Sequence, residues 1–277
     1  MLLQFITGLV LAIVISFLAW KTKNLSLSGA FAAAILGTII FGLGGLAWAV
    51  LLLGFFISSS LLSRAFGRRK ASLAEKFSKG SQRDAGQVMA NGGVAGGMVL
   101  VGLLFPNSTW IWAAFAGALA AVNADTWATE LGVLSRSLPV MIHTGKPVEK
   151  GTSGAISLAG TFSALSGAAL IGGLAISFWQ GTPAIDLRGA LLWMAVISLA
   201  GLIGSLVDSF LGATIQAIYH CPSCNKETER HPTHACGSPT TRVRGLAWMD
   251  NDLVNSICSL AGAASALVLG LLIFRLG

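Results

Sequence analysis

The feature that most constrains this chain is its repeated alternation of long apolar runs with shorter polar stretches. Apolar runs of about 20 residues match the thickness of a bilayer, where helices satisfy their own backbone hydrogen bonds. The 277-residue chain is 54% hydrophobic and only 10% charged, whereas soluble domains are about a quarter charged. The sequence therefore predicts an all-α polytopic transmembrane helical bundle formed by a single domain, 1–277. Eight spans are expected, at 2–20, 28–43, 46–63, 86–105, 109–133, 153–178, 188–218 and 253–274.

The basic residues divide unevenly between the two ends of such a bundle. With eight spans, 16 of the 18 Lys and Arg residues fall in odd-numbered loops. Because cytoplasmic loops are enriched in Lys and Arg, we expect these loops in the cytoplasm and both termini outside. The third loop, 63–84, is the most basic. For the part of this loop before Lys76, an anchor on anionic lipid is the alternative to a role in a functional site. Despite the net charge of +7, this distribution argues against a nucleic-acid partner.

The first span is expected to stay in the protein. The stretch 2–20 has no basic region before it and no small-residue cleavage pattern after it. Secretory signal peptides carry both features. We therefore predict an integral membrane protein, retained in a plasma membrane of the prokaryotic type.

The stretch 121–135 places polar side chains inside one of the apolar spans. At the 100° spacing of a helix, Asn123, Asp125, Thr129 and Glu130 share one half of the circumference. A charged residue within a span costs roughly 2.5–3.5 kcal/mol, so it persists mainly where it has a partner or a function. The alternative is a pair of acids near a helix end that extend to water. We expect this face to form one wall of a functional site.

Three other spans carry polar faces near the same end of the bundle. Each face combines side-chain amides or hydroxyls with a charged residue at helical spacing. For an aspartate deep in a span, a hydrogen bond to a neighbouring helix is the alternative to a functional role. The three sets are Arg83, which precedes the fourth span, with Gln87 and Asn91 inside it; Ser205, Asp208 and Gln216 in the seventh; and Asp252 and Asn255 at the start of the eighth.

The end of the fifth loop has the composition of a phosphate-binding turn. Lys150, Gly151, Thr152 and Ser153 precede the sixth span. Thr152 or Ser153 is expected to cap that helix, and a helix N-terminus beside a lysine attracts anions. An ordinary capped helix start flanked by lysines explains the same pattern.

The seventh loop, 219–246, contains a set of metal-ligating residues. Cys221 and Cys224 form a CxxC pair, and His231, His234 and Cys236 follow. Two thiolates with a later His and Cys form a tetrahedral zinc site. The expected ligands are Cys221, Cys224, His234 and Cys236, with His231 as the alternative histidine. A disulfide is the competing interpretation, and the predicted cytoplasmic location disfavours it. Four protein ligands leave no open position, so a structural zinc site is expected.

Five segments resemble an uncharacterised membrane family that includes a plant phytyl-phosphate kinase. The resemblance covers nearly the whole chain, and it extends more distantly to phytol and dolichol kinases and to CDP-diacylglycerol synthase. Those enzymes use CTP with Mg²⁺. The segments are NADTWATELG at 123–132, RDAGQVMANGG at 83–93, GTSGAIS at 151–157, GSLVDSFLGATIQ at 204–216 and DNDLVN at 250–255.

The resemblance implies a CTP-dependent, Mg²⁺-assisted kinase that converts an isoprenoid monophosphate to the diphosphate. Asp125 and Asp208 would hold magnesium, since hard oxygen ligands suit this ion, while Lys150 and Arg83 would neutralise charge that develops during transfer. The alternatives are a cytidylyltransferase that forms a CDP-lipid, and a lipid or ion transporter that uses intramembrane carboxylates. The expected nucleotide and lipid-phosphate contacts are Gln87, Asn91, Asn123, Thr129, Glu130, Gly151, Thr152, Ser153, Ser205, Gln216, Asn251, Asp252 and Asn255.

Overall fold

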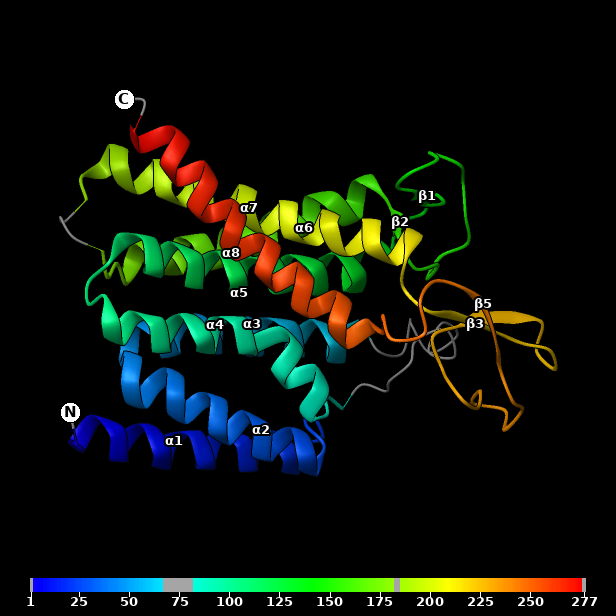
Figure 1. Ribbon diagram of the computed structural model, residues 1–277, viewed down its shortest axis with the longest axis horizontal. Coiled ribbons are helices and arrows are strands. Elements are labelled where there is room, and N and C mark those ends of the chain that lie inside the picture. Colours follow the sequence, from blue (N-terminus) through cyan, green and yellow to red (C-terminus); the bar gives the residue numbers. More distant parts are fainter. Residues whose placement is uncertain (1, 67–81, 182–184, 276–277) are drawn as a thin grey trace.

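The computed structural model describes residues 2–66, 82–181 and 185–275, which form a bundle of antiparallel helices (Figure 1). Seven helices in these ranges are long and apolar enough to cross a membrane, with α2 and η1 counted as one. The helical prediction is thus confirmed. The helices are α1 (Leu2–Lys21), α2 (Leu27–Gly37), the π-helix η1 (Thr38–Gly44), α3 (Leu46–Phe66), α4 (Ala85–Leu104), α5 (Thr109–Gly132), α6 (Leu158–Ser177), α7 (Leu187–Thr214) and α8 (Asn251–Arg275).

The remaining long helix, α5, lies at the centre of the bundle. Every residue from 112 to 124 is buried, and α5 packs against α3, α4, α6, α7 and α8. Near its start, Trp112 and Phe115 both contact the ring of Trp48 in α3, with centroids 5.1 and 4.6 Å away. A helix enclosed by other helices can carry polar residues that lipid would reject. This position accounts for the polar segment that distinguishes α5 from the seven apolar helices.

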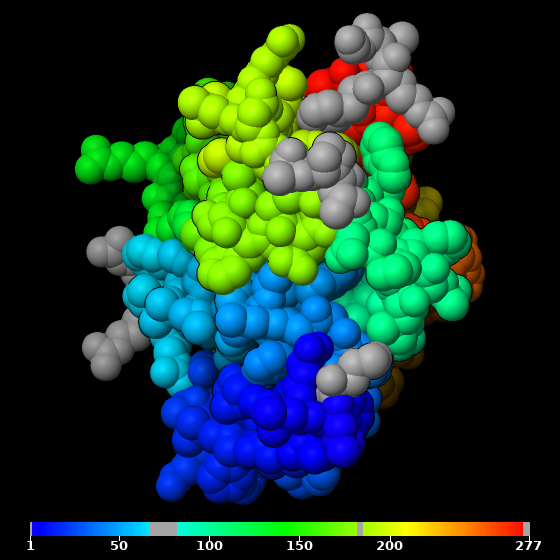
Figure 2. All heavy atoms as spheres, turned by 90° about the vertical axis from the view of Figure 1, so that its left-hand side faces the viewer, coloured from blue at the N-terminus to red at the C-terminus, as the bar shows by residue number. Residues whose placement is uncertain are grey.

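Both termini lie at one end of the bundle, together with the loops that follow α4 and α6 (Figure 1). Seen from this end, α1 and α2 form an outer layer, α3 and α4 lie next to it, and the ends of α6 and α7 lie beyond them (Figure 2). The loops between α1 and α2, between α5 and α6 and between α7 and α8 lie at the opposite end, which we call the sheet end because it carries the strands (Figure 1). The basic residues therefore gather at the sheet end within the described ranges, and its cytoplasmic location stays a prediction. The lipid-anchor interpretation of the third loop concerns mainly residues 67–81, which lie outside the described ranges.

Five short strands cover the sheet end. The strands β1 (Val140–Met141) and β2 (Ala155–Ile156) pair with each other, and β3 (Ile218–Cys221) lies between β4 (Lys226–Thr228) and β5 (Thr241–Arg244). The expected span 188–218 is therefore too long, because α7 ends at Thr214 and Ile218 already belongs to β3. The guanidinium of Arg244 donates to the carbonyl of Ala213 and so caps the last turn of α7.

The sixth span also begins later than its sequence predicts. Neither Thr152 nor Ser153 caps it; Ser157 does, by accepting a hydrogen bond of 3.1 Å from Gly160 N. The segment 151–154 is instead a turn in which Gly151 and Gly154 have positive φ. A Cβ on Gly154 would lie 2.3 Å from the backbone nitrogen of Ala213. The turn therefore packs directly against the end of α7, which the helix-cap interpretation did not foresee.

Candidate active site

A polar cavity of about 410 Å³ lies at the sheet end, where α4, α5, α7 and α8 have their polar termini. Its wall is completed by the turn 150–157 and by the loop that follows β4. The helices bring together nearly all residues that the sequence predicted for the site. These are Arg83, Gln87, Asn91, Asp125, Thr129, Glu130, Lys150, Gly151, Thr152, Ser153, Ser205, Asp208, Gln216, Asn251 and Asn255.

Carboxylates form one side of the cavity. The Oδ2 atom of Asp208 is buried and has no hydrogen-bond partner within the described ranges. The carboxylates of Asp125 and Glu229 are its charged neighbours, and the hydroxyl-bearing Ser205 beside it is 4% exposed. A buried carboxylate oxygen among like charges is costly unless a cation compensates for it. This oxygen-rich donor set fits a hard divalent ion such as Mg²⁺.

Arg83 provides positive charge on another side of the cavity. Its guanidinium lies over the rings of Phe55 and Phe56, with centroid distances of 5.6 and 5.9 Å, and it donates to Ser60 Oγ at 3.4 Å. Burial lowers the pKa of Arg83, and the nearby Glu130 carboxylate opposes this effect. An arginine remains protonated in proteins, so the buried group keeps its charge and donors.

The backbone around Arg83 is held by the start of α2 and by the cap of α4. Its amide donates to Asn24 O and its carbonyl accepts from Ser26 N, both at 3.0 Å. Asp84 then caps α4 by accepting from Gln87 N at 2.9 Å, while the Gln87 side chain accepts from Asp84 N at 3.2 Å. This capping box fixes where the stripe of polar residues enters the bundle.

A chain of hydrogen bonds connects the turn, the end of α7 and the sheet. Ser153 Oγ donates to Gln216 Oε1 at 2.9 Å, and Gln216 Nε2 donates to Glu229 Oε1 at 3.0 Å. Gln216 is only 2% exposed, so this chain is shielded from water. Sequence reasoning missed Glu229 because it lies between two zinc-ligand motifs and shows no helical periodicity. Lys150, on the same turn, donates from Nζ to the carbonyl of Ser135.

Two predicted contacts do not line the cavity. Asn123 is fully buried, where its amide donates to Gly167 O at 2.7 Å and its oxygen accepts from Ser58 Oγ at 3.0 Å. Its assignment as a substrate contact is corrected, because both polar ends join α5 to α6 and α3. Asp252 lies in the first turn of α8, and its neighbours Asn251 and Asn255 face the cavity instead.

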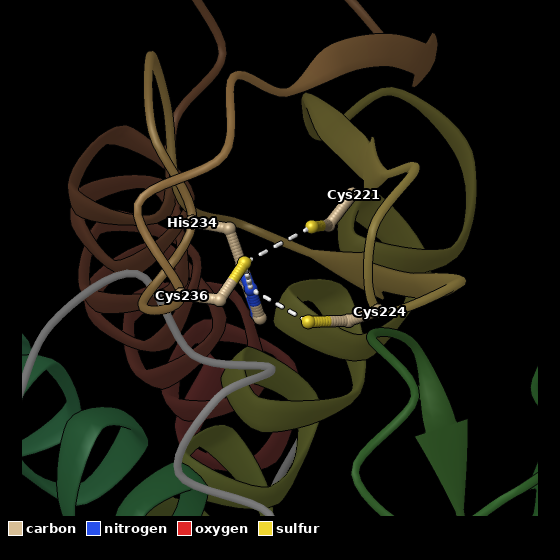
Figure 3. A group of neighbouring side chains, drawn as sticks. All are labelled: Cys221, Cys224, His234 and Cys236. Carbon is tan, nitrogen blue, oxygen red and sulfur yellow. Dashed lines mark hydrogen bonds between the residues drawn. The ribbon is translucent and has the colours of Figure 1, made fainter.

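The Cys and His residues of the sheet form a compact cluster (Figure 3). One ligand atom from each of Cys221, Cys224, His234 and Cys236 lies within 4.8 Å of all the others. The Sγ atoms of Cys221 and Cys236 are 3.6 Å apart, and His234 Nδ1 is 3.5 Å from Cys224 Sγ and 3.2 Å from Cys236 Sγ. Tetrahedral zinc with bonds of about 2.0–2.3 Å gives edges of about 3.6–3.8 Å. The cluster therefore has nearly the size of a tetrahedral metal site.

The two candidate zinc-ligand histidines, His231 and His234, have different surroundings. The ring of His231 stacks on Tyr219 with a centroid distance of 4.4 Å and an interplanar angle of 12°, and it is not part of the cluster of four ligand atoms. His234 is 4% exposed and presents Nδ1 to them. Hydrogen bonds from Ser238 and His234, with smaller contributions from its other neighbours, lower the pKa of Cys236 to about 5. All four cysteines are free thiols, and no disulfide competes for these ligands.

The model of the integral membrane protein family DUF92 matches residues 10–263. The chain belongs to this family. It is 34% identical to Protein PGR of Arabidopsis thaliana over 270 residues, which cover 92% of each chain. An uncharacterised membrane protein of Methanocaldococcus jannaschii is 31% identical over 220 residues, covering 78% of this chain and 84% of the relative. A Synechocystis membrane protein is 27% identical over 240 residues, covering 85% and 78%. No solved structure matches.

The DUF92 match places the whole site inside the family region. Residues 10–263 include α2 to α7, the three-stranded sheet and the first half of α8, so both the cavity and the Cys/His cluster fall within it. The membrane family expected from the five sequence segments is thereby confirmed. None of the relatives' names specifies a reaction, so the chemistry has to be inferred from the cavity itself.

Proposed function

We propose that this DUF92 protein is a CTP-dependent, Mg²⁺-assisted kinase that converts an isoprenoid monophosphate to its diphosphate. The observation that carries the proposal is the composition of the cavity: a buried carboxylate oxygen on Asp208 lies in one chamber with the cations Arg83 and Lys150. Enzymes that transfer phosphoryl groups work mainly by positioning and charge neutralisation, which require this combination. The chamber lies at the sheet end of the bundle, where a lipid phosphate and a soluble nucleotide would meet.

The reaction requires little from the protein in the way of proton transfer. An oxygen of the lipid monophosphate attacks the γ-phosphorus of CTP, and a new P–O bond forms. The bond between the γ-phosphorus and the β,γ-bridging oxygen breaks, and CDP leaves with that electron pair. Because the acceptor phosphate is largely ionised at neutral pH, no strong general base is needed. This fits a cavity in which no histidine occurs among the described lining residues.

Four charged residues of the cavity have a defined part in this proposal. Asp125 and Asp208 would hold Mg²⁺, and the ion would supply charge neutralisation at the nucleotide phosphates. Arg83 binds the acceptor phosphate, and Lys150 binds the donor phosphates beside the turn 151–154. Removing one such group costs about 10²–10³-fold in rate where it acts mainly on the transition state. We further place the nucleotide on the cytoplasmic side, because the basic residues gather at the sheet end.

The test is phosphoryl transfer by purified protein in liposomes that contain a prenyl monophosphate. With Mg²⁺ and γ-labelled CTP, the label is expected in a prenyl diphosphate, and Asp125→Asn should reduce the rate at least about a hundredfold. The matched control is Asp186→Asn, which lies at the far end of α7 and should retain the activity. Full activity in Asp125→Asn would overturn the metal role.

The position of the label separates the competing functions. A cytidylyltransferase would place an α-label in the lipid and release pyrophosphate, whereas the kinase leaves an α-label in CDP. A transporter would move lipid or ions across liposomes without any nucleotide. Either outcome, in the absence of a γ-labelled diphosphate, would replace the kinase assignment.

We also propose that the Cys/His cluster binds one structural zinc ion. The supporting observation is that three sulfurs and His234 Nδ1 surround one point at tetrahedral spacing. Zinc would then fix the hairpin of β3 and β4, from which Glu229 reaches the cavity. One zinc per chain is expected by elemental analysis of protein purified without added metal, and its absence would refute this assignment.

A further inference from the structure

A second cavity, apolar and about 100 Å³ in volume, lies between α1, α2, α3 and α4. Its lining is almost entirely aliphatic and aromatic, with Leu36, Leu52 and Phe55 among its residues. Three polar residues of α4 and its cap, however, line this cavity and the polar cavity alike: Arg83, Gln87 and Asn91. An apolar chamber and a charged chamber therefore meet along one face of a single helix.

The junction has the chemistry of a lipid head group. Within the described residues, Arg83 is the only charged side chain that lines the apolar cavity. Phe55 and Phe56, over whose rings the guanidinium lies, line the apolar cavity, and its charged neighbour Glu130 lines the polar cavity. A guanidinium in this position can bind a phosphate, while the rings beside it contact the first carbons of an attached chain.

Small residues create the space for such a chain. Ala12, Ala33, Gly37 and Gly92 line the apolar cavity where larger side chains would fill it. A Cβ on Gly92 would already lie 2.3 Å from a methyl group of Leu36. Even a methyl group at Gly92 would therefore displace Leu36, which itself lines the cavity.

We propose, on the basis of the kinase function proposed above, that the apolar cavity is a groove for the acceptor lipid. This groove holds the head-proximal part of the isoprenoid chain, and the phosphate of the lipid lies on Arg83. The chain enters from lipid rather than from water, so burial in the groove adds little hydrophobic free energy. The groove therefore acts by positioning: it holds the phosphate oxygen at the junction, in line with the nucleotide chamber. Long acceptors consequently gain in kcat/KM over short ones that cannot fill the groove.

The proposal is tested by filling the groove with Ala33→Phe and comparing acceptors of two lengths. The matched control is Ala34→Phe, the same change at the next position of α2, which does not line the cavity. With a monophosphate of several isoprene units, Ala33→Phe should lose about tenfold or more in kcat/KM. With methyl phosphate, an acceptor that has no isoprenoid chain to place in the cavity, it should match the control. Equal losses on both acceptors, or no loss on either, would overturn the proposal.

A binding measurement separates this proposal from the kinase assignment. A long prenyl phosphate with a photoreactive group in its first isoprene unit is cross-linked to the wild-type protein in liposomes, without nucleotide, and the labelled peptides are identified by mass spectrometry. Labelling of α1–α4 that excess prenyl phosphate abolishes, and the matching prenyl alcohol does not, supports the groove. This result together with no phosphoryl transfer would refute the kinase and leave the lipid site standing. Labelling that ordinary phospholipid competes equally well would refute the groove.

Discussion

Asp208→Asn is predicted to make the protein more stable while it removes ligand binding. The Oδ2 atom of Asp208 is buried without a hydrogen-bond partner in the described part of the chain, and Asp125 and Glu229 are its charged neighbours. Leaving a buried polar group unsatisfied costs about 1–3 kcal/mol, and more when the group is charged. The isosteric amide still lacks a partner but carries no charge. We therefore expect a gain of about 1–2 kcal/mol in the free energy of unfolding.

Thermal unfolding in detergent, followed by tryptophan fluorescence, measures both parts of this prediction. For a chain of this size, 1–2 kcal/mol raises the Tm by about 2–8 °C. Wild-type protein should be stabilised further by Mg²⁺ with CTP, by about 2.7 kcal/mol at a hundred times the Kd, and Asp208→Asn should lose this response. The control is Asp186→Asn. Asp186 caps α7 by accepting from Gly189 N at 2.8 Å, and Asn caps a helix as well as Asp does. That control should therefore keep both the wild-type Tm and the ligand response. A lower Tm in Asp208→Asn with an intact ligand response would instead identify Asp208 as a structural hydrogen-bonding residue.

Two further variants examine the cluster and the helix interface. His234→Ala should lose bound zinc, whereas His231→Ala should keep it, because only His234 presents Nδ1 to the thiols; equal zinc contents by elemental analysis would contradict this. Asn123→Ala should lower the free energy of unfolding by about 1 kcal/mol, since it removes the bonds to Gly167 O and Ser58 Oγ. Its kcat/KM at permissive temperature should equal that of the wild type, and a large fall in kcat/KM would restore Asn123 to the site.

Much of the cavity could be predicted from helical spacing alone. Asp125 and Asp208 lie in otherwise apolar helices, where the cost of a charge makes an unexplained acid conspicuous. Arg83 and Asn91 follow the same periodicity at the start of α4. Helical spacing and the cost of a charge within a span are both visible in a single sequence. The sequence alone was therefore sufficient to group these residues at the same end of the bundle.

The parts that sequence could not supply depend on contacts between distant segments. Ser153 appeared to cap a helix, yet Gly154 packs on Ala213 and the helix begins later. Glu229 reaches the cavity only because Gln216 bridges it to the turn. Asn123 carries the same amide as the true lining residues, and only its partners reveal that it joins helices. Tertiary packing decides each of these cases, because the local sequence is compatible with both outcomes.

The convergence of the carboxylates follows from small residues one helical turn away. A Cβ on Gly204 would lie 2.4 Å from the Cβ of Ala121, so α5 and α7 approach closely at this level. Asp208 follows Gly204 by four residues and Asp125 follows Ala121 by four, which places each aspartate on the same face as its small residue. The faces that touch through small side chains therefore present two carboxylates toward one another at the next turn. Close packing in the membrane and the charge-rich chamber at its edge are thus two consequences of the same pair of helix faces.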